Sequence, residues 1–218
     1  MIRAVKNRYG AANELGVFAM TEQGIRPVSN PSAIFLSGTR EPTPGSCVLV
    51  TWEGSRPLLV EVQVLIDDCV SNYPKRVAVG IDSQRLVLLL AGLSRHGGCQ
   101  LHQYDVYVNV VGGLKVNETA IDMALLVALM SSLRRKPIPR DLVVFGEIGL
   151  ASEVRPVQSG MLRLKEAEKH GFKQAIIPKA NVNKQLQSKL KLYPVSHIQE
   201  ALRVIADQLQ EPMGVVDE

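Results

Sequence analysis

The chain has 218 residues, of which 46% are hydrophobic and 21% charged, a balance that excludes a disordered or fibrous protein. Its net charge of +4 comes from dispersed lysines and arginines, so an anionic partner is permitted but not required. Cys47, Cys69 and Cys99 form no CxxC metal pair, and their odd number argues against a disulfide framework. We therefore expect small core thiols in a reducing, cytoplasmic compartment.

Apolar patterning divides the chain into a strand-rich first half and a second half that mixes helices with strands. The stretch VEVQV alternates apolar with polar residues, as a strand with one exposed face does. One expected helix, at 119–133, is apolar nearly all round and should be buried, and Gly171 should stop the next one. The pattern predicts strands over 46–52, 57–66, 75–81, 104–111, 141–148 and 173–178, and helices over 83–96, 119–133, 160–171 and 198–210.

These elements predict one compact α+β domain with helices packed on mixed sheets. We place a basic leader at 1–10, the domain at 11–210 and a loose tail at 211–218. The longest apolar runs, at 86–93 and 123–130, are far below the roughly 20 residues of a membrane helix, so no membrane span is expected. The sequence has no GxxxxGK[ST] phosphate loop, and ATP should not bind this chain in that manner.

Three stretches carry a family resemblance: AVKNRYGAANELGVFAM (4–20), VSNPSAIFLS (28–37), and FGEIGLASEVRPV (145–157) with EAEKHGFKQAIIPKAN (166–181). Together they resemble the RadA (Sms) family of bacterial recombination proteins, with Tyr9 replacing the phenylalanine of a Lys-Asn-Arg-Phe-Gly signature. Only the C-terminal half of that family is matched. We therefore expect a fragment without the family's four-cysteine zinc module and RecA-like ATPase core. The resemblance implies a Lon-protease-like (ribosomal protein S5 domain 2-like) fold.

Peptidases of the Lon type use a serine-lysine dyad, and the resemblance places these two positions at Ala120 and Met161, or Leu162 if the register slips by one. None of these side chains offers a nucleophilic oxygen or a basic nitrogen. Lys165 follows about one helical turn later, roughly 6 Å from the needed place. Peptidase chemistry is therefore not expected.

Thr119 is the nearest replacement for the missing serine. Its spacing from Asp122 is that of a capping box, in which each side chain bonds the other residue's main-chain N–H, and we prefer this interpretation. Ser131 and Ser132 lie further along the same apolar helix, where we expect them to bond main-chain carbonyls. An active peptidase that uses one of these hydroxyls is the alternative.

The signature KNRYG (6–10) is basic, and its charge alone indicates a solvated leader. The family resemblance implies more: Lys6 and Arg8 would reach a neighbouring subunit's nucleotide and stabilise charge developing on the γ-phosphate. Asn7 and Gly10 would shape the loop. In this chain the role would be latent, because the ATPase core is not part of it.

A second group of cations stands at the ends of predicted elements, where several of them would form a rim and contact DNA phosphates in a ring-shaped assembly. For any single residue an ordinary exposed charge is the simpler reading. By the resemblance we prefer Arg76, Arg85 and Lys115 as the DNA contacts.

The resemblance further implies a homo-hexamer that binds single-stranded or branched DNA and works with the RecA recombinase in branch migration and repair. The intact protein would use ATP and Mg, with zinc in the missing module, while this fragment needs no cofactor. A pure oligomerisation domain without a nucleic-acid role is a further alternative.

Overall fold

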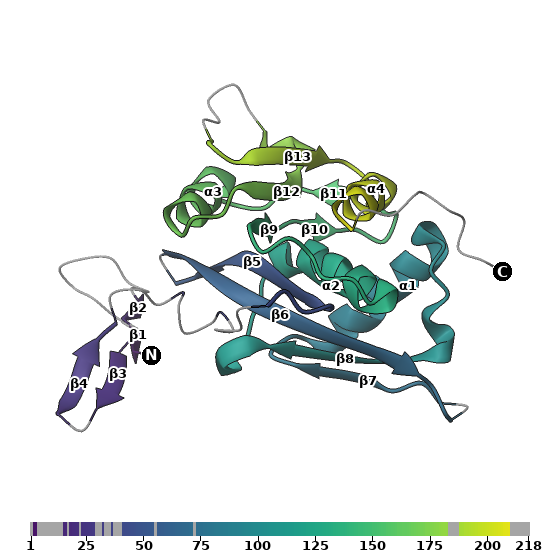
Figure 1. The fold of residues 1–218 in the computed structure, drawn as a ribbon, viewed down its shortest axis with the longest axis horizontal. Coiled ribbons are helices and arrows are strands. Elements are labelled where there is room, and N and C mark those ends of the chain that lie inside the picture. The colour runs from purple at the N-terminus through teal and green to yellow at the C-terminus, as the bar shows by residue number, and fades with distance from the viewer. Residues whose placement is uncertain are drawn as a thin grey trace.

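The computed structural model describes residues 2–3, 15–16, 18–21, 23–28, 32, 36, 41–54, 56–71, 73–182 and 188–209. Its centre is a seven-stranded mixed sheet with helices packed against it (Figure 1). From one edge to the other, the strands are β13 (Lys191–Val195), β12 (Gln174–Pro178), β9 (Leu142–Val144), β5 (Ser46–Glu53), β6 (Arg56–Asp68), β8 (Tyr104–Val110) and β7 (Arg76–Val79). Strand β6 is antiparallel to both neighbours, and the other pairs are parallel. The predicted α+β class is confirmed.

The helices divide between the two faces of this sheet because alternate strand residues point to opposite sides. They are α1 (Ser83–Gly97), α2 (Asp122–Arg134), α3 (Gly160–Lys169) and α4 (Ile198–Gln208), each close to its predicted range. Leu49 and Val144 belong to the apolar cluster that holds α1, α2 and α4. Their neighbours Val50 and Val143 belong to the cluster of α3.

Helix α2 is the central helix of the larger cluster, and it is buried from Asp122 to Ser131, as predicted from its apolar sequence. Leu125 and Leu129 are at most 2% exposed. Burying a leucine of this kind stabilises a fold by roughly 1.5–3 kcal/mol. The head of α2 is therefore held firmly against the sheet.

Glycines end two of the helices. Gly98 follows α1 with φ of 70°, and Gly171 follows α3 with φ of 83°, where a residue with a side chain is strained. The N–H of Gly171 donates to the Glu168 carbonyl and that of Phe172 to the Ala167 carbonyl, which is a Schellman motif. The prediction that Gly171 stops its helix is confirmed.

The prediction of one continuous strand over 141–148 was wrong. The segment is broken into β9 and a short β10 (Glu147–Ile148), which pairs with β11 (Val154–Arg155) in a separate two-stranded sheet. Between them, the Gly146 N–H donates to the carbonyl of Ala120 at 2.9 Å. A Cβ on Gly146 would lie 2.3 Å from the Met123 sulfur. Close packing on the head of α2, which periodicity does not reveal, turns the chain out of the sheet.

Two further features differ from the prediction, one in the main sheet and one in helix α2. Strand β13, KLYPV, was missed because it is a largely exposed edge strand that carries a proline. The expected bond to a main-chain carbonyl is confirmed for Ser131, although the carbonyl lies beyond the end of α2, and it was wrong for Ser132. Ser131 donates to the Lys136 carbonyl at 2.5 Å, and Ser132 accepts from the Ile66 N–H at 3.0 Å. Both hydroxyls join α2 to neighbouring segments.

The cysteines are free thiols, and Cys47 and Cys99 lie in the core, as predicted. Burial raises the pKa of both thiols, so neither is a reactive thiolate. The prediction of a core thiol was wrong for Cys69, which is partly exposed and donates to the Ser71 carbonyl at 2.7 Å.

The N-terminal part forms two short antiparallel pairs, β1 (Ile2–Arg3) with β2 (Leu15–Gly16) and β3 (Phe18–Thr21) with β4 (Gly24–Pro27). Figure 1 shows them beside the main sheet rather than within it. The predicted tail at 211–218 and most of the predicted leader at 1–10 lie outside the described residues. In the described part, no helix has the length and apolar character that a membrane crossing requires.

Candidate functional site

The head of α2 lies where the family resemblance places the serine of a peptidase dyad. A 3-10 turn, η4 (Thr119–Ile121), leads into the helix, and its middle residue Ala120 is 1% exposed. Ala120 belongs to the apolar cluster that contains Phe145 and Leu164. A methyl group is thus packed at this position, and it has no oxygen to attack a carbonyl carbon.

The position that the resemblance assigns to the lysine is equally inert. Met161 is the second residue of α3 and half-buried, and Leu162 beside it is 48% exposed. Neither side chain accepts a proton. Lys165 lies one turn further along and is exposed to solvent. The start of α3 is fixed instead by Asn181, whose side chain bonds both the N–H of Val157 at 3.0 Å and its carbonyl at 2.8 Å.

The capping box predicted for Thr119 and Asp122 was wrong. The Thr119 hydroxyl donates to the Glu147 carboxylate at 2.6 Å, and no side-chain cap is formed at the head of η4 or of α2. The 3-10 turn displaces Thr119 from the capping position, and β10 brings Glu147 within reach. A carboxylate that accepts this hydroxyl proton is the one feature that resembles an activated nucleophile.

Asp122 is committed to an ion pair with Arg85 rather than to a cap. Its side chain is fully buried, and Arg85 Nε donates to it at 2.9 Å while a second guanidinium nitrogen binds the other oxygen. The Ile148 N–H donates to the same carboxylate at 3.0 Å. Burial raises the pKa of Asp122, and the hydrogen bonds from Arg85 and Ile148 oppose that rise. The bond to Asp122 raises the pKa of Arg85. This pair joins α1, α2 and β10.

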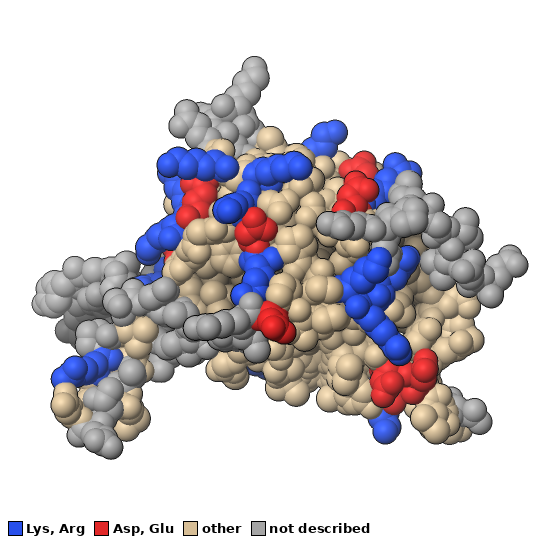
Figure 2. All heavy atoms as spheres, in the orientation of Figure 1, with Lys and Arg blue, Asp and Glu red and all other residues tan. Residues whose placement is uncertain are grey.

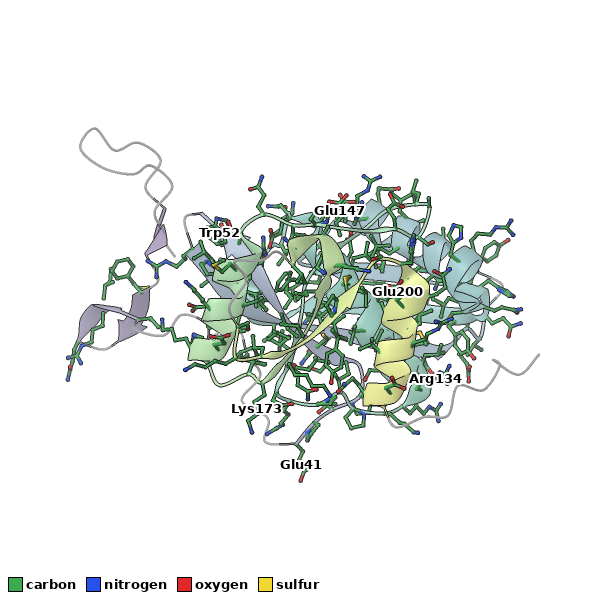
Figure 3. The ribbon with its side chains drawn as sticks, turned by 90° about the horizontal axis from the view of Figure 1, so that it is seen from above. Glu41, Trp52, Arg134, Glu147, Lys173 and Glu200 are labelled. Carbon is green, nitrogen blue, oxygen red and sulfur yellow. The ribbon has the colours of Figure 1, made fainter. Side chains whose placement is uncertain are left out.

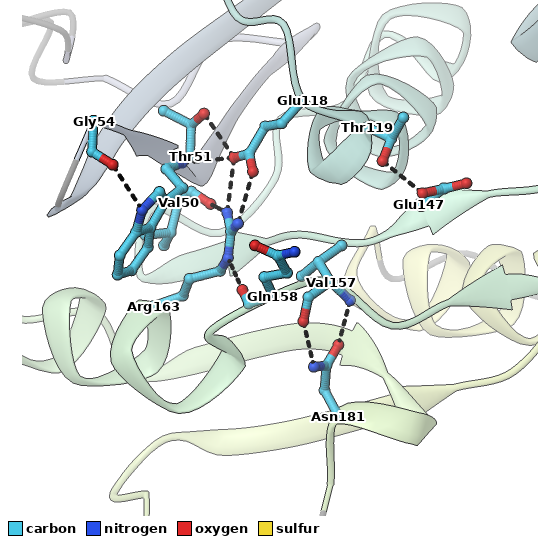
Figure 4. A network of polar contacts seen from close by, with 11 residues as sticks. Val50, Thr51, Gly54, Glu118, Thr119, Glu147, Val157, Gln158, Arg163 and Asn181 are labelled. Carbon is cyan, nitrogen blue, oxygen red and sulfur yellow. Dashed lines mark hydrogen bonds and ion pairs between the residues drawn. The ribbon is translucent and has the colours of Figure 1, made fainter. Parts of the chain in front are cut away.

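A second ion pair, between Glu118 and Arg163, spans the gap between η4 and α3 (Figure 4). Arg163 is 1% exposed, and its two terminal nitrogens donate to the two Glu118 oxygens at 2.8 and 2.7 Å. Arg163 also donates to the carbonyl of Gln158 at 2.9 Å and to that of Val50 at 2.5 Å. The guanidinium of Arg163 therefore donates hydrogen bonds within the fold from each of its nitrogens and is not free to contact a substrate.

Glu118 completes this network on the side of the main sheet. It accepts from the Thr51 hydroxyl at 2.7 Å and from the Trp52 N–H at 2.6 Å. The sequence reasoning missed the whole pair. Its one signal was an arginine in the stripe of α3 that also contains the buried Leu164 and Ala167, where a cation needs a partner.

A small pocket of about 220 Å³ opens beside the Thr119–Glu147 contact. Arg85, Glu147 and Arg155 supply its charged groups, and Leu88 and Leu150 supply apolar wall. Arg155 lies 3.8 Å from Glu147 and pairs more closely with Glu153. The volume of this pocket is below the roughly 300–1,000 Å³ of ordinary ligand pockets, so the pocket can hold at most one side chain.

The three predicted DNA contacts do not form one group. Lys115 is exposed, in the loop where the neighbouring Val116 N–H donates to the Gly80 carbonyl. Gly80 follows β7, and Arg85 lies in the first turn of α1 just beyond it. Arg76 begins β7, about 10 Å away by the strand rise.

The two arginines also have partners within the fold. The Arg76 guanidinium donates to the carbonyls of Leu101 at 2.7 Å, Lys75 at 3.0 Å and Tyr104, whereas Arg85 is bound by Asp122. Lys115 is thus the most accessible of the three. On the face that Figure 2 shows, basic and acidic side chains are interspersed.

The signature residues Lys6, Asn7, Arg8 and Gly10 lie outside the described residues. The part of the chain that the structure describes holds no cluster of three or more histidine, cysteine, aspartate or glutamate side chains arranged for a metal ion.

Comparison with known proteins supports the resemblance drawn from the sequence. The family model described as subunit ChlI of Mg-chelatase matches residues 71–181, just over half of the chain. DNA repair protein RadA of Escherichia coli K12 is 59% identical over 206 residues, which are 94% of this chain and 45% of that protein. The RadA proteins of Pseudomonas aeruginosa and Aquifex aeolicus are 58% and 44% identical, over 93% and 94% of this chain and 45% and 46% of their own lengths.

The chain thus spans less than half the length of the curated relatives that it matches. The RadA resemblance, with its restriction to the C-terminal part, is confirmed. The chain belongs to the family that the ChlI model describes, and it corresponds to the C-terminal part of RadA-type DNA repair proteins.

Proposed function

We propose that this chain is a non-proteolytic Lon-like module of a RadA-type DNA repair protein, and that it serves as an assembly platform and a scaffold for DNA. The main support is the pair of positions that the resemblance assigns to the peptidase dyad. Ala120 and Met161 carry no reactive group there, and an ion pair between the buried Arg163 and the partly exposed Glu118 joins the surrounding elements. A fold stabilised in this way is suited to holding neighbouring parts in place.

In this proposal the chemistry resides outside the chain. The assembly is a homo-hexamer in the cytoplasm that hydrolyses ATP with Mg in its ATPase core, carries zinc in a separate module and acts with RecA on single-stranded or branched DNA. Lys6 and Arg8 contribute in trans to ATP hydrolysis, with Asn7 and Gly10 shaping their loop. The names of the relatives support the repair role, since each is a DNA repair protein.

The DNA-binding part of the proposal centres on Lys115. Its ammonium is exposed, in the loop before η4, so a phosphate can approach it. Arg85 lies at the same end of the sheet and Arg76 at the other. Both arginines contribute positive potential, but the guanidinium of Arg76 donates to main-chain carbonyls and that of Arg85 to the Asp122 carboxylate. Reversing either arginine would disturb the fold and the binding together, so Lys115 gives the cleaner test.

We expect Lys115→Glu to weaken binding of single-stranded DNA. Each phosphate contact that is lost reduces the slope of log affinity against log salt by about 0.7. Fluorescence anisotropy of a labelled oligonucleotide, titrated at several salt concentrations, measures both quantities. The matched control is Lys173→Glu, because Lys173 is exposed and lies on the side of the molecule away from Glu147 (Figure 3). Equal losses in both variants, or none in either, would refute the proposed contact.

The interspersed charges in Figure 2 favour a second candidate, an assembly platform without DNA contacts. This candidate predicts that Lys115→Glu leaves affinity and salt slope unchanged, while light scattering still shows a ring.

A further inference from the structure

The hairpin of β3 and β4 presents an apolar face that nothing in the described structure covers. In its register Phe18 stands opposite Pro27, and Met20 stands opposite Ile25. Since facing residues and residues two apart share one side of a ribbon, Phe18, Met20 and Ile25 lie on one face and Arg26 on the other. Met20 is 89% exposed, Ile25 64% and Phe18 37%.

The hairpin has little support from the rest of the described chain. Its strands form a two-stranded sheet of their own, set apart from the main sheet (Figure 1). The Phe18 ring lies over Gly16, where a Cβ would come within 2.6 Å of it, so β2 covers only the base of the face. Two-stranded hairpins are at best marginally stable in water, so a hairpin with Met20 and Ile25 open to solvent requires a further element for stability.

We propose that this face packs against the domain that precedes the matched part in RadA-type proteins, so that strands β3 and β4 belong to that domain's core rather than to the Lon-like body. The relatives are about twice as long as the chain, and the chain corresponds to their C-terminal part. In those relatives the unmatched N-terminal part belongs to the same chain as the matched part, which makes its effective concentration at this face high. An apolar face with its single described cation on the opposite side does not suit DNA phosphates.

The proposal moves the domain boundary from residue 10 to the end of β4. The main body begins directly after β4, since Val28 and Leu36 pack against its two buried clusters and the Leu59 N–H donates to the buried Ser32 hydroxyl at 3.2 Å. The inference depends on the correspondence with the C-terminal part of the relatives and not on any role in DNA binding. The Lys115 experiment and the experiment below therefore fail independently.

Hydrogen exchange tests the proposal in two proteins: the chain of 218 residues, and a chimera in which the unmatched N-terminal part of E. coli RadA precedes it. We expect the amides of β3 and β4 to exchange at least about tenfold more slowly in the chimera, because covering the apolar face stabilises the hairpin against local opening. The amides of α2 serve as the internal reference, and their exchange should be equal in both proteins.

Two variants of the chimera give the test its specificity. Met20→Thr with Ile25→Thr removes the apolar contact but keeps residues that favour strands, and it should restore fast exchange. Arg26→Thr makes a similar change on the opposite face and should leave the protection intact. Equally fast exchange in chimera and chain would overturn the proposal. Protection that rises with the concentration of the chain alone assigns the face to a second copy, and protection that requires single-stranded DNA assigns it to nucleic acid; either result also overturns it.

Discussion

Replacing Arg163 with methionine is expected to lower the free energy of unfolding by about 3 kcal/mol, the lower end of the usual cost of breaking a buried ion pair, because Arg163 is buried while Glu118 is 25% exposed. Methionine retains most of the apolar stem of arginine, so the lost stability measures the contribution of the guanidinium group rather than the cost of a cavity. Without it, Glu118 loses two charge-assisted bonds and the carbonyls of Val50 and Gln158 lose their donor. Urea unfolding monitored by the fluorescence of Trp52, the single tryptophan, measures the change.

Lys165→Met is the matched control, since Lys165 is an exposed cation two residues along the same helix. Its effect should stay within about 0.5 kcal/mol. Adding Glu118→Gln to Arg163→Met should recover part of the loss, because the unpaired carboxylate is then removed as well. If Arg163→Met is no more destabilising than Lys165→Met, the ion pair does not hold η4 and α3 together.

Replacing Arg85 with methionine is expected to lower the free energy of unfolding by about 2–4 kcal/mol at pH 7, because it leaves the fully buried Asp122 carboxylate without its ion-pair partner. The loss of unfolding free energy caused by Arg85→Met should be smaller at pH 5 than at pH 7. Burial already raises the pKa of Asp122, and losing the guanidinium that opposes this rise moves the pKa further up. A folded-state pKa above the unfolded one gives stability that is fully present below the unfolded pKa and is lost as pH rises through the folded pKa.

Unfolding of the wild-type protein and the Arg85→Met variant at both pH values tests this. Arg95→Met, a change to an exposed arginine in the last turn of the same helix, controls for the loss of a surface charge. An equal loss at pH 5 and pH 7 would show that Asp122 does not take up a proton when its partner is gone.

Sequence periodicity was sufficient for the elements that bury a regular apolar face. Helix α2 and strands β5 and β6 were predicted close to their observed ranges, because their burial follows the same periods as their residues. Strand β13 has no such pattern. The break at Gly146 is set by close packing against Met123, which no local pattern records.

The polar contacts of the candidate site could not be predicted from the sequence for a different reason. Glu118 and Arg163 are 45 residues apart, and Arg85 and Asp122 are 37 apart, so each pair depends on tertiary placement. The family resemblance suggested that Arg85 contacts a phosphate, whereas the fold turns its guanidinium toward the buried Asp122 carboxylate. Local spacing likewise suggested a cap for Thr119, but the 3-10 turn and the arrival of β10 gave it Glu147 instead. The family resemblance, by contrast, needed only the motifs, and it was confirmed.

Turnover of a set of fluorogenic peptides is the most direct test of the central claim that this peptidase-like fold does not cut peptides. The chain alone and the chimera with the unmatched N-terminal part of E. coli RadA should both release fluorophore no faster than buffer, and Thr119→Val should change nothing. Hydrolysis above that background that disappears on Thr119→Val would identify a threonine nucleophile next to Glu147, and the scaffold account would then be wrong.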